Sequence, residues 1–503
     1  MAAFELSSLF SDHAVLCRGK EIRIFGSAAD GTAVKVTLLS ASGSLMASDT
    51  VEARNGRFIA LLPPQEAAVH CTLRVTDGHT ETLACDIAIG DVFLAGGQSN
   101  MELELRNADG GPADIRSHEN ILVRYYNVPR CAVEGPDTDE ENRKAHWQEI
   151  HPGEGRDMSA VAYYFAMKLQ QEINVPIGIV DCYWGGSSIS CWMTEETMQS
   201  IAEGQRYLRD YSQRVGEKTM EEYLLEEKIF QHGTQTWDRK AEKLKKSNPG
   251  ITAQELNALL GPYPWFPPDG PGSPYRPCGL SMTMLSRVEP LSLTGVLFYQ
   301  GEADADRTEH YDILLAAFIT QLRRQFKDPL LPFLNIQLPM WNELGKSDSG
   351  NWPKLRQAQD TVAKHTRNSD LVILIDQGEY DNIHPTNKKV VGERLCYTAL
   401  KTIYHMDAPV SPVPACKYLK DGCLYVVTDQ PVIETGDAEP LFEIAGDDGV
   451  FYEANTELQQ GTVFKLSHLQ VARPTKVRYA WRDYAKVRYF GENGLPLAPF
   501  ILE

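Results

Sequence analysis

The chain has 503 residues, of which 43% are hydrophobic and 23% are charged, and its formal net charge at pH 7 is −19. This length exceeds what one hydrophobic core normally supports, so we expect about two to four folded domains. The acidic balance argues against a nucleic-acid partner, because such binding depends on Lys and Arg side chains that neutralise phosphates.

The ten cysteines are scattered along the chain without a Cys-x-x-Cys pair. This spacing predicts no metal cluster and no disulfide framework, so we expect free thiols in a reducing compartment. The first residues, MAAFELSSLFSDHAVL, lack the basic and apolar segments of a secretory signal. No stretch approaches the roughly 18 apolar residues of a membrane span, so no membrane partner is expected. We therefore expect a cytoplasmic protein, or a secreted or periplasmic one if a leader has been removed.

Residues 1–88 have the pattern of a β domain. The segment EIRIFGSAADGTAVKVTLLS alternates apolar and polar residues on both sides of an Ala-Asp-Gly turn, and GRFIALLP and CTLRVTDG follow closely. Short alternating strands separated by turn residues are typical of a small β-sandwich. The β pattern returns in residues 409–503, for example in CLYVVTD and TKVRYAWRD. We expect a C-terminal β-rich segment there, which could complete the N-terminal β domain as one composite unit.

Residues 89–408 alternate between continuous apolar runs and segments of helical periodicity. The runs DVFLAGG, VPIGIVDCYW, LTGVLFYQG and LVILIDQG are typical of parallel strands buried on both faces. The pattern predicts an α/β domain with a parallel sheet between two helical layers. Ligands of such sheets bind beyond the carboxyl ends of the strands.

One segment interrupts the alternation. Residues from about 195 to 262 are rich in Glu, Lys and Gln with helical periodicity, and the Pro- and Gly-rich stretch GPYPWFPPDGPGSPYRP follows. This stretch can be neither a helix nor a central strand. We expect a helical insertion that returns beside or over the ligand-binding edge of the sheet, or else a solvated decoration.

A serine stands where the first apolar run of the α/β domain ends. In DVFLAGGQSNM, the glycines permit the sharp turn that would lift Ser99 out of the end of the sheet. A serine hydroxyl is a poor nucleophile unless a base is within reach. On local sequence alone, Ser99 fits a nucleophile and a helix N-cap equally well.

A candidate base follows the last apolar run. In DQGEYDNIHPTNKK, Asp381 lies three residues before His384 in a loop. An aspartate can orient an imidazole whose second nitrogen faces a serine, as in serine hydrolases. Because Ser99 and His384 follow the first and the last strand of the same predicted sheet, their pairing favours a nucleophile over a cap.

Two more strand ends offer donors for an oxyanion. DCYWGGSSISCW supplies Gly185 and Gly186, whose backbone N–H groups are unshielded by side chains, and FYQGEADAD supplies the side-chain amide of Gln300 beside Glu302 and Asp304. Removing one oxyanion donor costs about 3 kcal/mol in favourable cases. Four strand ends with polar or glycine residues therefore indicate an acyl-transfer site.

These four blocks resemble those of the SGNH (GDSL-like) hydrolases, and among them the sialate O-acetylesterase-like carbohydrate esterases. GGQSNM resembles their nucleophile block, WGGSSISCW their glycine block, FYQGEADA their Gln-Gly-Glu block and DNIHPTNKKVVGERL their Asp-x-x-His block. LFSDHAVLCRGKEIRIFGSA and the segments PTKVRYAWRD and NGLPLAPF resemble their flanking β regions. The resemblance covers nearly the whole chain except residues 195–262, and it implies a flavodoxin-like SGNH domain flanked by β-sandwich-type segments.

The resemblance implies that Ser99 is the nucleophile, His384 the general base and Asp381 its orienter. It also implies an oxyanion hole formed by the backbone N–H of Ser99 with Gly186 and Gln300. His384 would remove the serine proton during attack on an acetyl carbonyl and then protonate the departing sugar oxygen. No metal and no organic cofactor is required.

Two departures from the family pattern leave alternatives open. Many SGNH enzymes place an asparagine in the third block, where this chain offers Gln300 and Asp304. Since an ionised aspartate cannot donate a hydrogen bond, Gln300 is the predicted donor. The orienting carboxylate varies among these esterases, so Asp376, or a serine–histidine dyad, is an alternative to Asp381.

The expected substrate is a glycan or small-molecule O-acetyl ester, with sialic acid as the first candidate. Acetyl xylan or another polysaccharide is the alternative within the same chemistry, and a carbohydrate-binding protein with a vestigial site is the alternative from another class. No long apolar lining favours a lipase or thioesterase. Trp184, Trp341 and the PYPWF segment could stack on a sugar, although aromatic residues at strand ends more often belong to the core.

Overall fold

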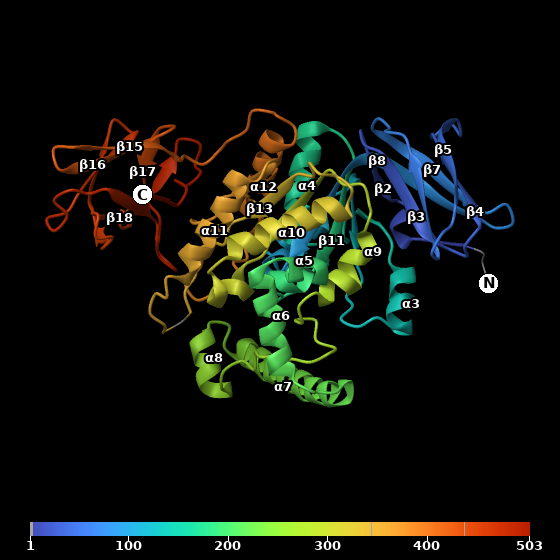
Figure 1. Cartoon of the computed structure of the whole chain (residues 1–503), viewed down its shortest axis with the longest axis horizontal. Coiled ribbons are helices and arrows are strands. Elements are labelled where there is room, and N and C mark those ends of the chain that lie inside the picture. Colours follow the sequence, from blue (N-terminus) through green and yellow to red (C-terminus); the bar gives the residue numbers. More distant parts are fainter. Residues whose placement is uncertain (1–3, 344, 437) are drawn as a thin grey trace.

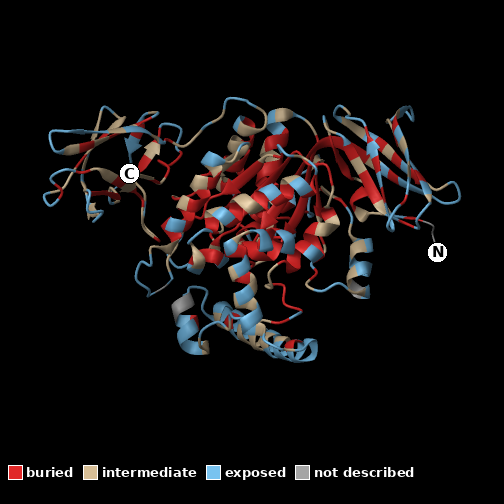
Figure 2. Ribbon diagram, viewed as in Figure 1, coloured by how far each residue is buried: buried red, intermediate tan, exposed pale blue. Residues whose placement is uncertain are grey.

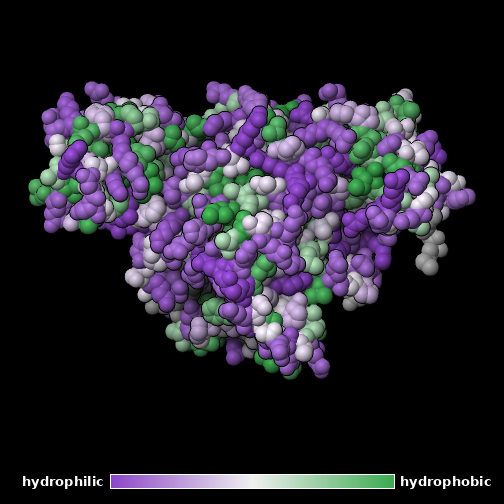
Figure 3. Space-filling model, in the orientation of Figure 1, coloured by the Kyte–Doolittle hydropathy of each residue, from purple (hydrophilic) through white to green (hydrophobic). Residues whose placement is uncertain are grey.

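A computed structural model describes residues 4–343, 345–436 and 438–503. Figure 1 shows a central α/β domain with β domains at its two ends, and a helical segment that extends below it. No helix in the described part of the chain is long and apolar enough to cross a membrane. Figure 3 shows that the surface seen from this side is mostly hydrophilic, with its apolar side chains in small separate groups.

The N-terminal domain consists of two facing β layers. One layer has the strand order β1-β3-β6, and the other is formed by β5, β4, β7 and the first half of β8, which β2 also joins. The strands alternate buried and exposed residues, as in Ala33–Leu39 and Arg57–Leu62, because only one face of each layer meets the core. The strands are β1 (Phe4–Leu6), β2 (Val15–Cys17), β3 (Ile22–Ala28), β4 (Ala33–Leu39), β5 (Leu45–Glu52), β6 (Arg57–Leu62) and β7 (Ala68–Thr76).

Strand β8 (Glu81–Gly97) belongs to both the N-terminal domain and the α/β domain. Its first half pairs antiparallel with β7, and its second half pairs parallel with β11 and β12. A boundary placed at residue 88 therefore falls inside one continuous strand, and the two sheets form a single hydrogen-bonded unit. This continuity fixes the N-terminal domain relative to the end of the strand that carries Ser99.

The α/β domain is built on a mostly parallel sheet with the strand order β10-β9-β11-β8-β12-β13-β14. Only β10 runs antiparallel to its neighbour, β9. The remaining strands are β9 (Asn120–Asn127), β10 (Gln148–Ile150), β11 (Ile177–Tyr183), β12 (Gly295–Tyr299), β13 (Phe333–Ile336) and β14 (Ser369–Val372). The helices are α1 (Ser99–Glu102), α2 (Gly111–Ser117), α3 (Pro136–Lys144), α4 (Ala160–Ile173), α9 (Ser286–Val288), α10 (Tyr311–Gln325), α11 (Asn351–His365) and α12 (Lys388–Thr402).

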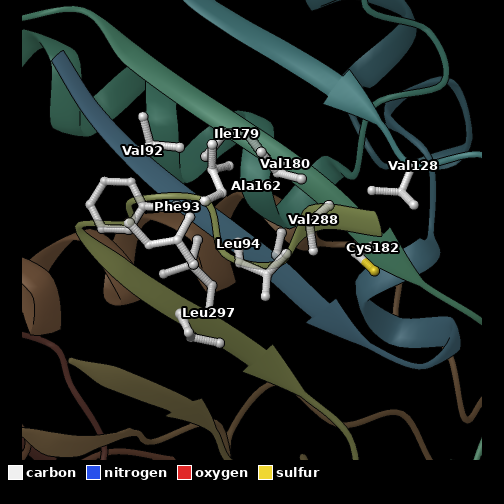
Figure 4. Packing of buried hydrophobic residues seen from close by; sticks show 14 of the residues in the cluster. Val92, Phe93, Leu94, Val128, Ala162, Ile179, Val180, Cys182, Val288 and Leu297 are labelled. Atoms are coloured by element: carbon white, nitrogen blue, oxygen red, sulfur yellow. The ribbon is translucent and has the colours of Figure 1, made fainter. Parts of the chain in front are cut away.

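The two strands that flank β8 in the parallel sheet are buried along their whole length. Every residue of β11 and β12 is buried, and Figure 2 shows this continuous buried band in the middle of the molecule. Helix α4 packs against α12, and α10 packs against α11. Figure 4 shows how Phe93 and Leu94 of β8 lie among Ile179, Val180 and Leu297 of the neighbouring strands. The expected α/β domain with a parallel sheet is therefore present.

The segment that interrupts the α/β pattern contains four helices: α5 (Glu195–Ser200), α6 (Ala202–Val215), α7 (Met220–Ser247) and α8 (Ala253–Leu260). In the 28-residue helix α7, only Tyr223 and Ala241 are buried. Helix α5 lies against the α/β domain (Figure 1), whereas Figure 2 shows α7 and α8 as largely exposed below it. The extended return after α8 leads back to the α/β domain.

The C-terminal strands pair only with one another among the described residues. They have their own apolar core, which also includes Met340 and Ile375 from the loops after β13 and β14. The two β segments lie at opposite ends of the molecule (Figure 1), so the expectation of one composite β unit is wrong. The strands are β15 (Pro414–Lys420), β16 (Cys423–Thr428), β17 (Val432–Glu434), β18 (Phe442–Ala445), β19 (Tyr452–Glu453), β20 (Asn455–Gln459), β21 (Val463–Ser467), β22 (Lys476–Tyr479), β23 (Tyr489–Gly491) and β24 (Phe500–Leu502).

Candidate active site

Ser99 is the first residue of helix α1, directly after the turn that ends β8. Gly97 has a φ of 133°, and a Cβ at this position would collide with the backbone of Tyr299 on the neighbouring strand. The turn therefore requires glycine, because only glycine allows both this backbone angle and this close approach. The side chain of Gln98 makes no cap hydrogen bond to the helix, and the hydroxyl of Ser99 is left to face the loop after β14.

His384 approaches Ser99 from that loop. Its Nε2 lies 2.7 Å from the Ser99 Oγ, and its backbone N–H donates to the Asn382 Oδ1 at 3.0 Å. Burial, together with the nearby ammonium group of Lys388, lowers the pKa of His384 to about 4. The imidazole is therefore neutral at physiological pH, which is the state that a general base requires.

The structure does not bring a carboxylate to His384. Asp381 is exposed, and no carboxylate among the described residues forms a hydrogen bond or ion pair with the imidazole. Asp376 pairs with Arg394, because both of its oxygens accept hydrogen bonds from that guanidinium at 2.6 Å. The pair that the structure forms is Ser99 with His384, and the orienting contact expected from Asp381 is absent.

Two backbone donors are free beside the serine. The N–H groups of Ser99 and Gly186 have no acceptor among the described residues, whereas the N–H of Gly185 donates to a carboxylate oxygen of Glu102. A Cβ on Gly185 would lie 3.4 Å from the Ser99 Cβ, so the glycine turn is adjacent to the nucleophile. Gly186, with a φ of 74°, is thus a candidate oxyanion donor and Gly185 is not.

Gln300 does not fit the oxyanion role expected of it. Its amide nitrogen donates to the Asp304 Oδ2 at 2.6 Å and also faces the Gln98 Oε1 and the Ser187 carbonyl oxygen, each at 3.2 Å. Its oxygen accepts from Tyr311 at 2.6 Å. Because both N–H groups are used inside a fully buried network, no donor remains for a substrate.

Gln98 is a candidate side-chain donor for the oxyanion in place of Gln300. Its oxygen accepts from the N–H groups of Gly301 at 3.3 Å and Ala303 at 3.2 Å, as well as from Gln300. Its amide nitrogen has no acceptor among the described residues. Gln98 stands directly before Ser99 in the nucleophile block, but sequence alone does not indicate which of the two glutamines keeps a free amide.

A buried polar network missed by the sequence reasoning joins three of the four blocks. Asn100 donates to the Glu302 Oε1 at 2.5 Å and to the Ile383 carbonyl oxygen at 2.9 Å, and it accepts from the Lys388 Nζ at 2.5 Å. Burial raises the pKa of Glu302 to about 7 and lowers that of Lys388 to about 7. Asn100 is adjacent to Ser99 and Ile383 to His384, so this network connects the nucleophile turn to the histidine loop.

Asp304 connects the third block to the glycine block and to the insertion. It accepts from the Ser188 hydroxyl at 2.6 Å, the Ile189 N–H at 2.9 Å and the Tyr207 hydroxyl at 2.8 Å, in addition to Gln300. Tyr207 belongs to helix α6 of the insertion. The insertion is therefore attached to the site, and nothing in the local sequence around Tyr207 signals this contact.

One group of side chains in the described part of the chain has the spacing of a metal site: His13, Asp86 and Glu149. The guanidinium of Arg124 lies 2.7 Å from Asp86 and 3.0 Å from Glu149. This buried cation pairs with both carboxylates, so it competes with a metal ion for the same oxygens. His13 precedes β2, Asp86 lies on β8 and Glu149 on β10, and none of them belongs to the four blocks.

Comparisons with known proteins agree with the geometry. Residues 272–401 match the family described as "Carbohydrate esterase, sialic acid-specific acetylesterase". The chain is 24% identical to the sialate O-acetylesterase of Mus musculus, covering 95% of this chain and 90% of the mouse protein. It is 25% identical to that of Rattus norvegicus, covering 99% of this chain and 94% of the rat protein.

A solved structure is similar over the same length. The crystal structure of a carbohydrate acetylesterase from Xanthomonas citri superposes with a TM-score of 0.75 at 26% identity, covering 99% of both chains. The match therefore includes both β domains and the insertion as well as the α/β domain.

Proposed function

Because this chain is related over its whole length to carbohydrate esterases of the sialate O-acetylesterase kind, we propose that it is a serine esterase that removes O-acetyl groups from carbohydrate. The observation that carries the proposal is the 2.7 Å contact between the Ser99 Oγ and the Nε2 of His384. This contact joins a hydroxyl and a neutral imidazole, which are the nucleophile and base of acyl transfer.

In the proposed mechanism, Ser99 attacks the acetyl carbonyl while His384 takes the serine proton. The oxygen of the tetrahedral intermediate accepts hydrogen bonds from the N–H groups of Ser99 and Gly186, with the Gln98 amide as a third donor. His384 then returns its proton to the departing sugar oxygen, which leaves an acetyl-serine. Water attacks this ester with His384 again as base, so that acetate is released and Ser99 is restored.

The strand order supports a flavodoxin-like SGNH architecture for residues 89–408. When β8, β11, β12, β13 and β14 are counted as strands one to five, the observed order is 2-1-3-4-5, which is the flavodoxin-like order. Strands β9 and β10 extend the edge next to β11. Such a sheet places its ligand beyond the carboxyl ends of the strands, which is where Ser99 lies.

Sialic acid is the proposed sugar, supported by the matching family description and by the rodent relatives. We further propose that the protein works in a reducing compartment. All ten of its cysteines are unpaired in the structure, and seven of them are buried, whereas proteins of oxidising compartments commonly pair theirs.

The test is acetate release by the purified protein from O-acetylated sialic acid and from acetylated xylan in parallel. Ser99→Ala should lower kcat on the preferred substrate by at least about 10⁴-fold, because the nucleophile acts as a unit with its base. Ser117→Ala, which removes an exposed hydroxyl on helix α2, is the matched control. Faster release from acetylated xylan would make xylan, and not sialic acid, the proposed substrate. No serine-dependent release from either sugar would refute the esterase proposal and favour a carbohydrate-binding role.

A further inference from the structure

The return segment of the helical insertion reaches the glycine turn of the candidate site. A Cβ built on Gly186 would lie 2.6 Å from the ring of Trp265 and 3.3 Å from that of Tyr275. The Trp265 ring therefore lies directly against Gly186, whose N–H is a proposed oxyanion donor. A group bound at Ser99 would have this ring as a neighbour.

The insertion holds Trp265 in this place. The indole N–H of Trp237 on helix α7 donates to the Gly261 carbonyl oxygen at 3.0 Å, and the ring packs edge-on against Tyr263 with centroids 5.0 Å apart. The rings of Trp265 and Tyr275 meet edge-on at 6.4 Å. Because Tyr207 of α6 bonds to Asp304, the insertion is attached to the site at two separate points.

Trp265 is nevertheless far from buried. It is 47% exposed although one part of its ring covers Gly186, so a large apolar surface remains open beside the serine. Burying such an aromatic surface is favourable, and leaving it exposed without a ligand is not. Because this open surface lies against Gly186, a ligand bound at Ser99 would cover it.

Two charged groups, Arg130 and Glu102, lie near Tyr275, the ring that packs against Trp265. Arg130 stacks on Trp184 with 4.3 Å from its guanidinium carbon to the ring centroid, and it forms an ion pair with Glu102 at 2.5 Å. The guanidinium charge is thus already balanced. The apolar C–H face of a sugar ring suits this combination of an open aromatic ring and a neutralised polar rim.

We infer that Trp265 is a specificity-determining residue that stacks on the sugar ring carrying the acetyl group, and that the insertion positions the Trp265 side chain for this contact. This inference rests on the proposed esterase function and adds the subsite for the departing sugar. The acetyl group itself is held by Ser99 and the oxyanion donors, so the ring contributes to binding the sugar and not to the chemistry at the carbonyl.

The variant Trp265→Ala tests the inference with two classes of ester. On O-acetylated sialic acid or acetylated xylo-oligosaccharide, whichever the wild type prefers, kcat/KM should fall about tenfold, equivalent to about 1.4 kcal/mol. On ethyl acetate, which has the same acetyl group but no sugar, kcat/KM should stay within twofold. Trp265→Phe should recover most of the sugar activity because it keeps an aromatic face.

Tyr418→Ala is the matched control, since Tyr418 is an aromatic residue of similar exposure, 45%, and lies on β15 of the C-terminal β domain. It should behave as the wild type on both esters. Unchanged sugar activity in Trp265→Ala would overturn the inference, and so would equal losses on both esters, which would assign Trp265 to the oxyanion turn. An absence of Ser99-dependent sugar deacetylation in the wild type would instead refute the proposed function itself.

Discussion

Asn100→Ala removes the centre of the network beside the proposed catalytic pair. Asn100 is fully buried and forms three hydrogen bonds, two of them with the ionisable side chains of Glu302 and Lys388. The third bond holds the Ile383 carbonyl oxygen at 2.9 Å, one residue before His384. The substitution therefore leaves two buried ionisable groups without this partner and releases the histidine loop from the nucleophile turn.

The size of the effect follows from these bonds. Hydrogen bonds to charged groups contribute about 1.5–3 kcal/mol each, and a neutral one about 1 kcal/mol. Leaving a buried polar group without its partner costs about 1–3 kcal/mol, so for Glu302 and Lys388 together we expect the α/β domain to lose about 2–6 kcal/mol of stability. A displacement of about 1 Å between reacting groups can lower the rate about 100-fold, so we expect a similar fall in kcat.

The assay compares Asn100→Ala with Asn107→Ala, which removes an exposed asparagine of the same segment whose amide contacts Glu104 at 3.3 Å. Both variants are measured for kcat and KM in acetate release and for the urea concentration that halves activity, because a multidomain chain need not unfold in two states. We expect the kcat of Asn100→Ala to fall with little change in KM, and its urea midpoint to drop. A kcat within threefold of Asn107→Ala, with the same midpoint, would refute the reasoning.

Two further predictions concern His384. Its pKa of about 4 means that the imidazole loses its ability to accept a proton only near that pH, so kcat/KM should fall on the acid side around pH 4; a fall centred near 6.5 would contradict the lowered pKa. The same lowered value implies stability that is present above the unfolded pKa of about 6.5 and lost as the pH falls through about 4. Because Asp381 forms no hydrogen bond or ion pair with the imidazole among the described residues, Asp381→Asn should keep kcat within threefold of the wild type. A loss of about 10⁴-fold would instead show that Asp381 orients His384 in the substrate complex.

The sequence by itself determined the features that depend on neighbouring residues. Apolar runs such as DVFLAGG must be buried on both faces, and alternating strands in residues 1–88 must cover a core on one face only. The Gly97 turn needs a residue without a side chain, so it could be read directly. Ser99 and His384 were predicted to lie close together because the carboxyl ends of parallel strands lie at the same edge of the sheet.

Only the tertiary structure decided how the buried polar groups share their partners. Gln300 and Gln98 are chemically equivalent in the sequence, yet packing uses both donors of Gln300 and leaves the amide nitrogen of Gln98 without an acceptor among the described residues. Lys388 looks like an ordinary helix residue, but α12 buries it against Asn100. Hydrogen bonds between residues far apart in the chain depend on how the layers pack, and the local sequence pattern does not predict that packing.

The two β segments and the insertion illustrate the same limit at the scale of domains. Alternation predicts that a strand has one buried face, but it does not say which element covers that face, so the C-terminal strands could not be assigned to their own core. Likewise, PYPWF reads as a return loop, and only the fold places Trp265 on Gly186, nearly 80 residues earlier in the chain. The reason is physical: a residue's own backbone preferences act locally, whereas burial and contact are properties of the assembled chain.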